Sequence, residues 1–455
     1  MKQFKGLISL AAVCLAGCVT GPEPVAPDLE APEAYQTELK LNQASSPDAP
    51  WWKGFSDPVL SELIETSLDQ NLDIEIALAN VARARAQVGA SESDLFPTFD
   101  AFVESEISSV LTGGVEAEAN ASGGGVVSFD PDIAGRNKRA LQGARARFEA
   151  ARFSLEDVRR LTASSVANQY IALRRSGAAI VLLETSLGLQ ERTLEIVSAR
   201  FDAGLSPALD VDRAAADLAR TQSQSSLLRA NRRSAEYALS VLVGETPRGE
   251  YMGLPEEDII PNYAAGPELG VPTDLLRRRQ DIRASEALLV GEIADIGVEK
   301  ADLYPSLRLP GTIGASRTTS NNGLNALTAN LGAVLDIPIF DAGRRRAEVD
   351  IQRAEADAAL AEYKSTLWDA IRETENALLQ IEALTEQKAE LEKAVESSQS
   401  AFNQLNALYR EGLADFINVL DAQRTLISSR EAVVAADANI ALAYIDLYTA
   451  VGYTE

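Results

Sequence analysis

The side chains that most often perform covalent chemistry are nearly absent from this chain. Its 455 residues include no histidine, and the two cysteines are Cys14 and Cys18, both close to the N-terminus. Metal sites built on His or Cys, His-based triads and cysteine nucleophiles are therefore excluded from the body of the protein. Carboxylate or Ser-Lys chemistry stays possible, but no motif for it stands out. We expect a protein that is not an enzyme and that holds no metal and no cofactor.

The N-terminal sequence suggests a role for Cys18. Lys2 and Lys5 precede an apolar stretch at 7–15, which is too short for a transmembrane helix and is typical of a signal peptide. The stretch leads into Leu-Ala-Gly-Cys, which resembles a bacterial lipobox. This resemblance implies cleavage before Cys18 and a covalent lipid on it, with outer-membrane sorting. Two or more acyl chains give stable anchoring. The alternative is an ordinary signal peptide with an incidental cysteine.

Charge and hydropathy further limit the classes of protein to which the chain can belong. The formal net charge is −25, which argues against nucleic-acid binding because phosphates would be repelled. Solubility alone is a sufficient alternative explanation for the acidic composition. After Cys18, no apolar run approaches the 18 or more residues of a transmembrane helix. If the protein crosses a membrane, it must therefore do so with β-strands.

The two halves of the chain repeat each other at a fixed offset of 208 residues. Four motifs recur: Asn-Leu-Asp-Ile at 71–74 as Arg-Gln-Asp-Ile at 279–282, Asp-Leu-Phe-Pro-Thr at 94–98 as Asp-Leu-Tyr-Pro-Ser at 302–306, Ala-Gly-Arg at 134–136 and again at 342–344, and Phe-Asp-Ala-Gly-Leu at 201–205 as Tyr-Arg-Glu-Gly-Leu at 409–413. Four anchors at one offset indicate an internal duplication.

The duplication predicts five consecutive segments. They are a signal peptide at 1–17, a proline-rich and lipid-anchored extended arm at 18–57, a first structural repeat at 58–243, a connector at 244–265 and a second structural repeat at 266–451. Each repeat is predicted to contain a helix, a β-hairpin and a helical hairpin. The β-hairpins fall at about 97–130 and 305–338, and the helical hairpins at about 136–243 and 343–451.

The helical hairpins are predicted to be unusually long. Residues 344–411 contain no Gly and no Pro, and a continuous helix there would be on the order of 100 Å long. Such a length implies a coiled coil or a helical barrel. In the first repeat Gly177 and Gly188 interrupt the corresponding stretch. Gly204 and Gly412 are predicted to form the two hairpin turns.

The strands suggest a shared barrel. Residues alternate with period two over roughly ten positions, as in a transmembrane barrel strand, although soluble hairpins have the same pattern. A barrel in lipid must close, and single-chain barrels have at least eight strands. One chain offers four, so two or three chains would have to share one barrel.

Longer motifs resemble a known family. They are Trp-Trp-x-x-Phe-x-Asp-Pro at 51–58, Asp-Leu-Phe-Pro at 94–97, Phe-Asp-Ala-Gly-Arg at 340–344, Tyr-Arg-Glu-Gly-Leu at 409–413 and Val-Leu-Asp-Ala-Gln-Arg at 419–424. Together they resemble the TolC-like outer membrane factor family, and within it the lipidated OprM-like or NodT-type branch. The chain departs from the family at Gln280, where relatives often have Pro.

The resemblance implies a mostly α-helical fold with a transmembrane β-barrel. It implies a homotrimer whose long-helix hairpins form an α-barrel below a shared 12-stranded β-barrel, with the connector in an equatorial belt. Such a protein is the passive outer-membrane exit duct of a tripartite efflux system in a Gram-negative bacterium. Its partners would be outer-membrane lipid, a periplasmic adaptor protein and an inner-membrane pump of the RND type, with small toxic compounds as cargo. The alternatives are a type I protein-secretion duct and a periplasmic lipoprotein without a pore.

The resemblance also places a periplasmic gate beyond the Gly412 turn, at Ile417 and Asp421. Their spacing of four puts both on one helix face. Three copies would form an apolar ring and an acidic ring, which restrict wetting and select ions. Asn418 stands where TolC itself has a further Asp. The alternative is that Ile417 packs in the helix interface and Asp421 pairs with Arg424.

Charged residues beyond both turns suggest a latch. Asp210 and Arg213 follow the first turn as Asp421 and Arg424 follow the second. We hypothesise that these four residues form an electrostatic latch between neighbouring hairpins. The turns themselves are expected to contact the adaptor through Gly204, Leu205, Gly412 and Leu413.

Overall fold

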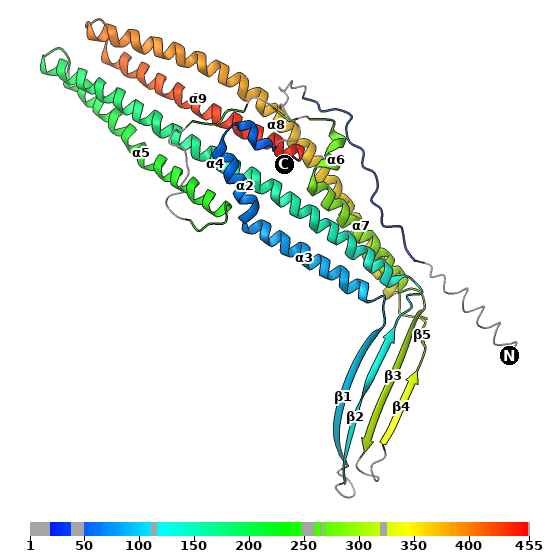
Figure 1. Ribbon diagram of the computed structural model, residues 1–455. Helices are drawn as coiled ribbons and strands as arrows, with labels where there is room; N and C mark the ends of the chain where they lie inside the picture. Colours follow the sequence, from blue (N-terminus) through cyan, green and yellow to red (C-terminus); the bar gives the residue numbers. More distant parts are fainter. Residues whose placement is uncertain are drawn as a thin grey trace. The chain divides into compact units, whose positions relative to one another are not determined.

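The computed structural model of the chain describes residues 19–37, 50–110, 116–247, 259–263, 266–267, 269–318 and 325–453 (Figure 1). The chain divides into two compact units. Unit 1 comprises the arm up to Leu29 together with Ala79–Phe153 and Ile282–Thr366, and it contains the sheet. Unit 2 comprises Glu30–Leu78, Ser154–Asp281 and Leu367–Glu455, and its described part is almost entirely helical. The predicted signal peptide, Cys18 and much of the connector lie outside the described residues.

Both repeats contain the same series of elements. In the first repeat these are α2 (Pro58–Gln70), α3 (Leu72–Ser93), β1 (Thr98–Val110), β2 (Glu116–Phe129), α4 (Arg136–Asp202) and α5 (Ala208–Leu242), preceded by the short helix η1 (Trp51–Phe55). In the second they are η2 (Pro272–Asp274), α6 (Leu275–Arg278), α7 (Gln280–Ala301), β3 (Ser306–Thr318), β4 (Asn325–Leu331), β5 (Val334–Asp336), α8 (Arg344–Arg410) and α9 (Phe416–Val451).

The long helices α4 and α8 have the same length, 67 residues each. The second agrees with the run free of Gly and Pro. The expectation that Gly177 and Gly188 interrupt the first is wrong, because α4 continues through both. A glycine within a helix costs only about 1 kcal/mol relative to alanine. The tertiary packing of buried α4 residues such as Tyr170 and Val197 outweighs that cost.

The two hairpin turns close in the same way. Gly204 and Gly412 have positive φ values of 73° and 76°, a conformation that glycine adopts without strain. At each turn the following leucine donates its N–H to a carbonyl five residues earlier: Leu205 to Arg200 and Leu413 to Leu408, both at 2.8 Å. This is the Schellman motif, which satisfies the last carbonyls of a helix. The turns predicted from the sequence are therefore present in both repeats.

The four long strands form one antiparallel sheet in the order β1-β2-β3-β4, with β5 paired to β3. The two edges of the sheet are therefore β1 and β4. Rows of directly paired residues cross it, such as Val103, Gly123, Ala315 and Leu327. Between β2 and β3 the backbones approach so closely that a Cβ on Gly124 would lie 2.3 Å from the Ile313 carbonyl oxygen.

The two faces of the sheet differ in polarity. One face carries apolar side chains that are almost fully exposed: Val103 (93%), Leu331 (86%), Leu327 (79%) and Ile107 (75%). On the opposite face of β1 lie the carboxylates of Asp100, Glu104 and Glu106. The alternation predicted from the sequence is thus present. A soluble sheet would bury its apolar face, and this one is left uncovered by the described residues of the chain.

The core of unit 2 is rich in aromatic residues and joins η1 to the end of α9. Trp51 stacks on Tyr448 at 5.7 Å, and Phe55 lies 4.6 Å from the ring of Tyr263 in the connector. Among the described helices only α9 is long and apolar enough to cross a membrane, by length and composition alone. Its Ala438, Ala441 and Ile445 belong to this core, so packing is a sufficient cause of its hydropathy.

Asp57 connects this core to the first helix. Its Oδ1 accepts the backbone N–H groups of Val59 and Leu60 at 2.9 and 3.1 Å, which caps α2. Its Oδ2 accepts the Tyr170 hydroxyl at 2.8 Å and lies 3.8 Å from the Arg174 guanidinium. One carboxylate therefore holds the start of α2 against α4.

We expect Asp57→Ala to lower the free energy of unfolding by about 1–3 kcal/mol, because it removes a helix cap and the carboxylate that accepts the Tyr170 hydroxyl. Thermal unfolding in detergent, followed by circular dichroism, measures this loss. Asp57→Asn keeps a capping oxygen and should lose less. Asp69→Ala, at an exposed position of the same helix, is the matched control. An equal loss in that control would contradict the assignment.

Candidate gate at the helical hairpin turns

A small apolar core joins the two hairpins of unit 2 near their turns. It is made by Val197 of α4, Ala214 of α5, Phe402 and Tyr409 of α8, and Phe416, Val419, Leu420 and Leu426 of α9. Both turns lie at the same end of the unit, as Figure 1 shows for the α4–α5 and α8–α9 hairpins. The core therefore places the predicted gate residues on a firm support.

The predicted gate residues lie on the exposed face of α9. Ile417 is 38% exposed, and the Asp421 side chain is 65% exposed. Asn418 is exposed as well, while Val419 and Leu420 point into the core. Ile417 and Asp421 share a face, as their spacing of four predicts. Within one chain Ile417 is partly covered, and Asp421 is mostly exposed beside Arg424.

Arg424 is held by a residue that the sequence analysis did not select. Its Nε lies 2.8 Å from Oδ1 of Asp217 on α5, whereas its Nη1 is 4.0 Å from Asp421. The Asp217 side chain is only 1% exposed and also accepts from Arg220 at 2.8 Å and Gln190 at 2.9 Å. Asp217 therefore ties α4, α5 and α9 together. Partial burial makes these charge-assisted bonds stronger than surface pairs.

The first-repeat residues lie in a separate group. Arg213 is 3.7 Å from Asp210, its own neighbour on α5, and Asp210 accepts the Ser206 hydroxyl at 3.0 Å. The same hydroxyl is 3.5 Å from the Tyr409 hydroxyl. Within one chain the four predicted latch residues thus form two pairs, Arg213 with Asp210 and Arg424 with Asp421. A latch between neighbouring chains stays a prediction.

Arg200 connects the two turns directly. Its Nη1 donates to the Arg410 carbonyl at 3.0 Å, and its guanidinium lies 4.9 Å from the centroid of the Tyr409 ring. The N–H of Gly412 bonds to the Tyr409 carbonyl at 3.0 Å, so this ring lies at the base of the second turn. Leu205 and Leu413, one at each turn, are 66% and 74% exposed. The turns therefore present two apolar side chains on a cross-linked support.

The missed residues leave only a weak signal in the sequence. Ala214, Asp217 and Thr221 follow one another at helical spacings of three and four and are all buried. A carboxylate among small residues on that stripe signals a buried, paired charge, because an unpaired one would be very costly. Its partner Arg424 comes from the other repeat, and no local spacing identifies it.

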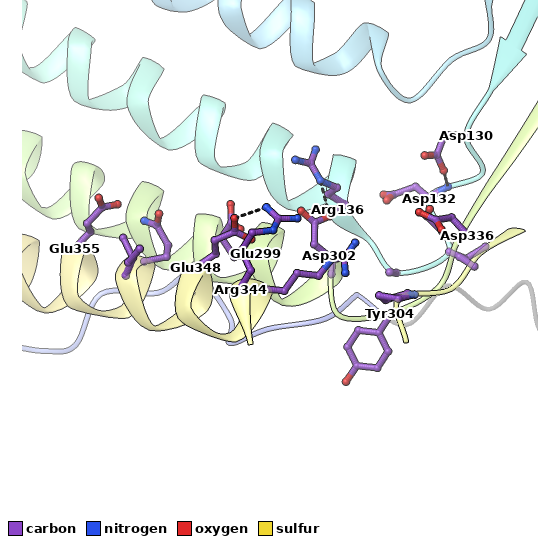
Figure 2. A pocket seen from close by; sticks show the side chains of 18 residues that line it. Asp130, Asp132, Arg136, Glu299, Asp302, Tyr304, Asp336, Arg344, Glu348 and Glu355 are labelled. Carbon is purple, nitrogen blue, oxygen red and sulfur yellow. Dashed lines mark hydrogen bonds and ion pairs between the residues drawn. The ribbon is translucent and has the colours of Figure 1, made fainter. Parts of the chain in front are cut away.

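A second charged site lies in unit 1, where a pocket of about 500 Å³ opens between helix starts and strand ends (Figure 2). Arg136 reaches across it to Asp302 at 2.9 Å, and Arg344 pairs with Glu348 at 2.7 Å (Figure 2). Burial is the main cause that raises the pKa of Glu299, and the charges of Asp302 and Glu348 add to it.

Two carboxylates near this pocket have structural tasks. Asp132 accepts the N–H groups of Asn137 and Lys138, both at 3.0 Å, and thereby caps α4. Asp341 accepts the N–H groups of Arg345 and Gly343 at the start of α8, and these bonds, Arg345 first, lower its pKa. In the described ranges no group of three His, Cys, Asp or Glu residues could hold a metal ion. We therefore interpret the pocket as the structural junction where the strands end and the helices begin.

The sequence profile of the outer membrane efflux protein family matches this chain twice, over residues 63–245 and 271–453. The chain belongs to this family. The double match confirms the duplication predicted from the 208-residue offset. It also confirms the TolC-like resemblance of the motifs.

Individual members of the family are similar over nearly the whole chain. Nodulation protein T of Rhizobium leguminosarum bv. trifolii is 27% identical over 447 residues, which cover 97% of this chain and 95% of that protein. The pyoverdine export outer membrane protein OpmQ of Pseudomonas aeruginosa is 28% identical, with 98% and 96% covered. The structure of the outer-membrane channel OprN superimposes with a TM-score of 0.88 at 30% identity, covering 96% of this chain and 99% of that one.

The family settles the general function. The chain is an outer-membrane channel protein of efflux systems in Gram-negative bacteria, and it is not an enzyme. The gate residues are therefore interpreted as parts of a passage rather than as reacting groups.

We expect Asp217→Ala to lower the free energy of unfolding of the turn region by about 1–3 kcal/mol, because three donors lose a charged acceptor. Hydrogen exchange of the amides in α9 near Val419 and Leu426 measures this opening. Arg220→Ala removes the other member of the Arg220–Asp217 ion pair, a side chain that is 62% exposed. It should lower the free energy of unfolding by less than about 1 kcal/mol. Equal protection in the Asp217 variant and the wild type would contradict this role.

Proposed function

We propose that three copies of the chain form one passive duct through the outer membrane, with a shared 12-stranded barrel and a helical tunnel. The duct passes small toxic compounds that an inner-membrane pump, of the RND type, delivers through a periplasmic adaptor. The single observation that carries this proposal is the unfinished sheet. The proposal includes the five segments predicted from the sequence: signal peptide, arm, first repeat, connector and second repeat.

The sheet cannot be complete within one chain. Its edge strands β1 and β4 have no partner on their outer sides among the described residues. Within a bilayer each unpaired N–H or C=O costs several kcal/mol, so an open edge cannot face lipid. A barrel needs at least eight strands and one chain supplies four long ones, so at least two chains are required. The family resemblance supports three.

Exposed apolar side chains support the same assembly. On the sheet, Val103 and Leu331 lie on the face that lipid would cover, and the carboxylates of Asp100 and Glu104 lie on the face that would line the lumen. On the helices of unit 2, Leu227 (65%), Trp368 (63%) and Ile76 (59%) are exposed. Neighbouring copies of the chain would bury those on the helices.

The cargo is proposed from the family rather than from a binding pocket. OpmQ is named for pyoverdine export and nodulation protein T for nodulation, so similar channels serve different systems. A wide tunnel contacts a passing compound through few groups and so recognises little. Selection would therefore reside in the pump and its adaptor.

Membrane anchoring at Cys18 completes the proposal. Cys18 lies outside the described residues, and the lipobox-like sequence before it supports cleavage of 1–17 and attachment of lipid. Val19, the first described residue, follows it directly. A lipid there would hold the chain at the periplasmic side of the outer membrane.

The proposed gate is tested by single-channel recording. Asp421→Ala and Arg424→Ala should each raise the conductance of the trimer in planar bilayers roughly twofold, because they weaken charged contacts that narrow the opening. Glu431→Ala changes an exposed carboxylate further along α9 and should leave conductance unchanged. Unchanged conductance in both gate variants would contradict the latch. A wild-type protein that forms no trimers and conducts no ions would contradict the duct itself.

The turns are tested by adaptor binding. Leu205→Asp together with Leu413→Asp should weaken binding of the periplasmic adaptor by tenfold or more, since each buried leucine contributes about 1.5–3 kcal/mol. Val25→Asp alters another exposed apolar residue (67%) and is the control. Undiminished binding in the double variant would show that the adaptor docks elsewhere.

A further inference from the structure

The described chain begins in a tightly built contact of unit 1. The Thr20 backbone N–H and its hydroxyl both donate to the Ala134 carbonyl, at 3.2 and 2.9 Å. Arg139 Nε donates to the Thr20 carbonyl at 2.9 Å, and its Nη2 to the Gly21 carbonyl at 3.4 Å. The Arg139 side chain is buried, with 5% of the residue exposed. Two nitrogens of this buried arginine thus donate to carbonyls of the arm, while its Nη1 donates to Gln142 Oε1 at 2.9 Å.

Glycines make room for this contact. A Cβ on Gly21 would lie 2.5 Å from the Gly297 Cα of α7, and Gly21 has a φ of +91°. A Cβ on Gly135 would lie 2.8 Å from the Val19 Cα. The arm therefore crosses α7 backbone against backbone, and larger residues at these positions would expel it. We call Ala134, Gly135, Arg139 and Gly297 the arm cradle.

The duplication supplies an internal comparison. At the 208-residue offset Gly135 corresponds to Gly343, Gly297 to Gly89 and Arg139 to Ala347. A Cβ on Gly343 or on Gly89 would meet no atom of the described residues within 4 Å. The equivalent position, made by Gly343 of the second repeat and Gly89 of the first, thus keeps both glycines but lacks the arginine and holds no described segment. The arm cradle is therefore present at only one of the two equivalent positions.

The arm cradle lies at the junction of strands and helices. Ala134 and Gly135 fall between the end of β2 and the start of α4, and Gly297 precedes β3 by less than three helical turns. The connecting segments at this junction expose aromatic and apolar side chains: Phe340 (89%), Ile339 (93%), Phe96 (63%) and Tyr304 (53%). Such residues gather where a barrel meets the headgroup layer.

We propose that the arm cradle is a docking site for Val19–Gly21 that fixes where the lipid on Cys18 enters the membrane, beside the base of the sheet. This inference rests on the lipid anchoring proposed above. Successive Cα atoms are about 3.8 Å apart, so a lipid carried by the residue before Val19 starts within about 8 Å of the Thr20 Cα. The lipid is then restricted to a position close to the arm cradle. Its acyl chains would enter the membrane beside the exposed side chains of the junction.

Hydrogen exchange of the Thr20 amide in the acylated protein, measured by mass spectrometry in outer-membrane vesicles, tests docking. Gly21→Ala alters only the arm, and Arg139→Met alters only the arm cradle. Each should speed exchange of the Thr20 amide by at least about tenfold, because its bond to Ala134 opens, while the amides of α4 and α7 keep their protection. Gly89→Ala and Arg145→Met, at exposed positions of α3 and α4, are matched controls and should change nothing.

The outcomes separate docking from the proposed function. Rapid exchange of the Thr20 amide in the wild type, or no change in either arm variant, would overturn docking even if the trimer conducts ions. The mass of the N-terminal peptide reports the lipid. A conducting wild-type trimer with an unmodified Cys18 would overturn the role of the arm cradle in placing the anchor. Protected Thr20 on an acylated Cys18, with release in both variants, is the expected result.

Discussion

The proposed duct depends on one constraint: every backbone N–H and C=O in a membrane-spanning sheet needs a partner. Four long strands in the order β1-β2-β3-β4 satisfy all the inner pairs and leave β1 and β4 as open edges. No rearrangement within the chain closes such a sheet, because four strands are too few to curve into a barrel. Val103 and Leu331 on the sheet, and Trp368 and Leu227 on the helices, are exposed in one chain, and the proposed assembly would cover them with lipid or with neighbouring copies.

At the junction the backbone changes from strand to helix within a few residues. In both repeats one aspartate caps the long helix that follows, Asp132 before α4 and Asp341 before α8. The arm is held at the same junction by Arg139. Further along the arm, the Glu375 carboxylate accepts the N–H groups of Gln36 and Thr37. A chain segment with few apolar residues is thus kept in place by hydrogen bonds from its backbone.

Much of the fold could be predicted from the sequence because its signals are periodic and doubled. The absence of Gly and Pro between 344 and 410 specifies α8, and Gly204 and Gly412 specify the turns. Local composition gave a wrong prediction for α4. The helix continues through Gly177 and Gly188 because its tertiary packing, which the sequence does not show, outweighs the cost of the two glycines. Of the candidate site, spacing correctly placed Ile417 and Asp421 on one face. It could not reveal that Asp217 holds Arg424, since the two residues lie 207 positions apart in the sequence and meet only across two hairpins.

The identical turns and the unequal links between them have a consequence for how the gene evolved. A single-repeat ancestor would have needed twice as many copies to present the same number of turns, and all the seams in its ring would have been alike. In the proposed trimer, duplication and fusion place one kind of contact between hairpins within a chain and the other between chains. Arg200 and Asp217 have no counterpart at the corresponding positions, which are Leu408 and Thr425. The fused gene could therefore fasten one seam permanently while leaving the other free to diverge as the movable one.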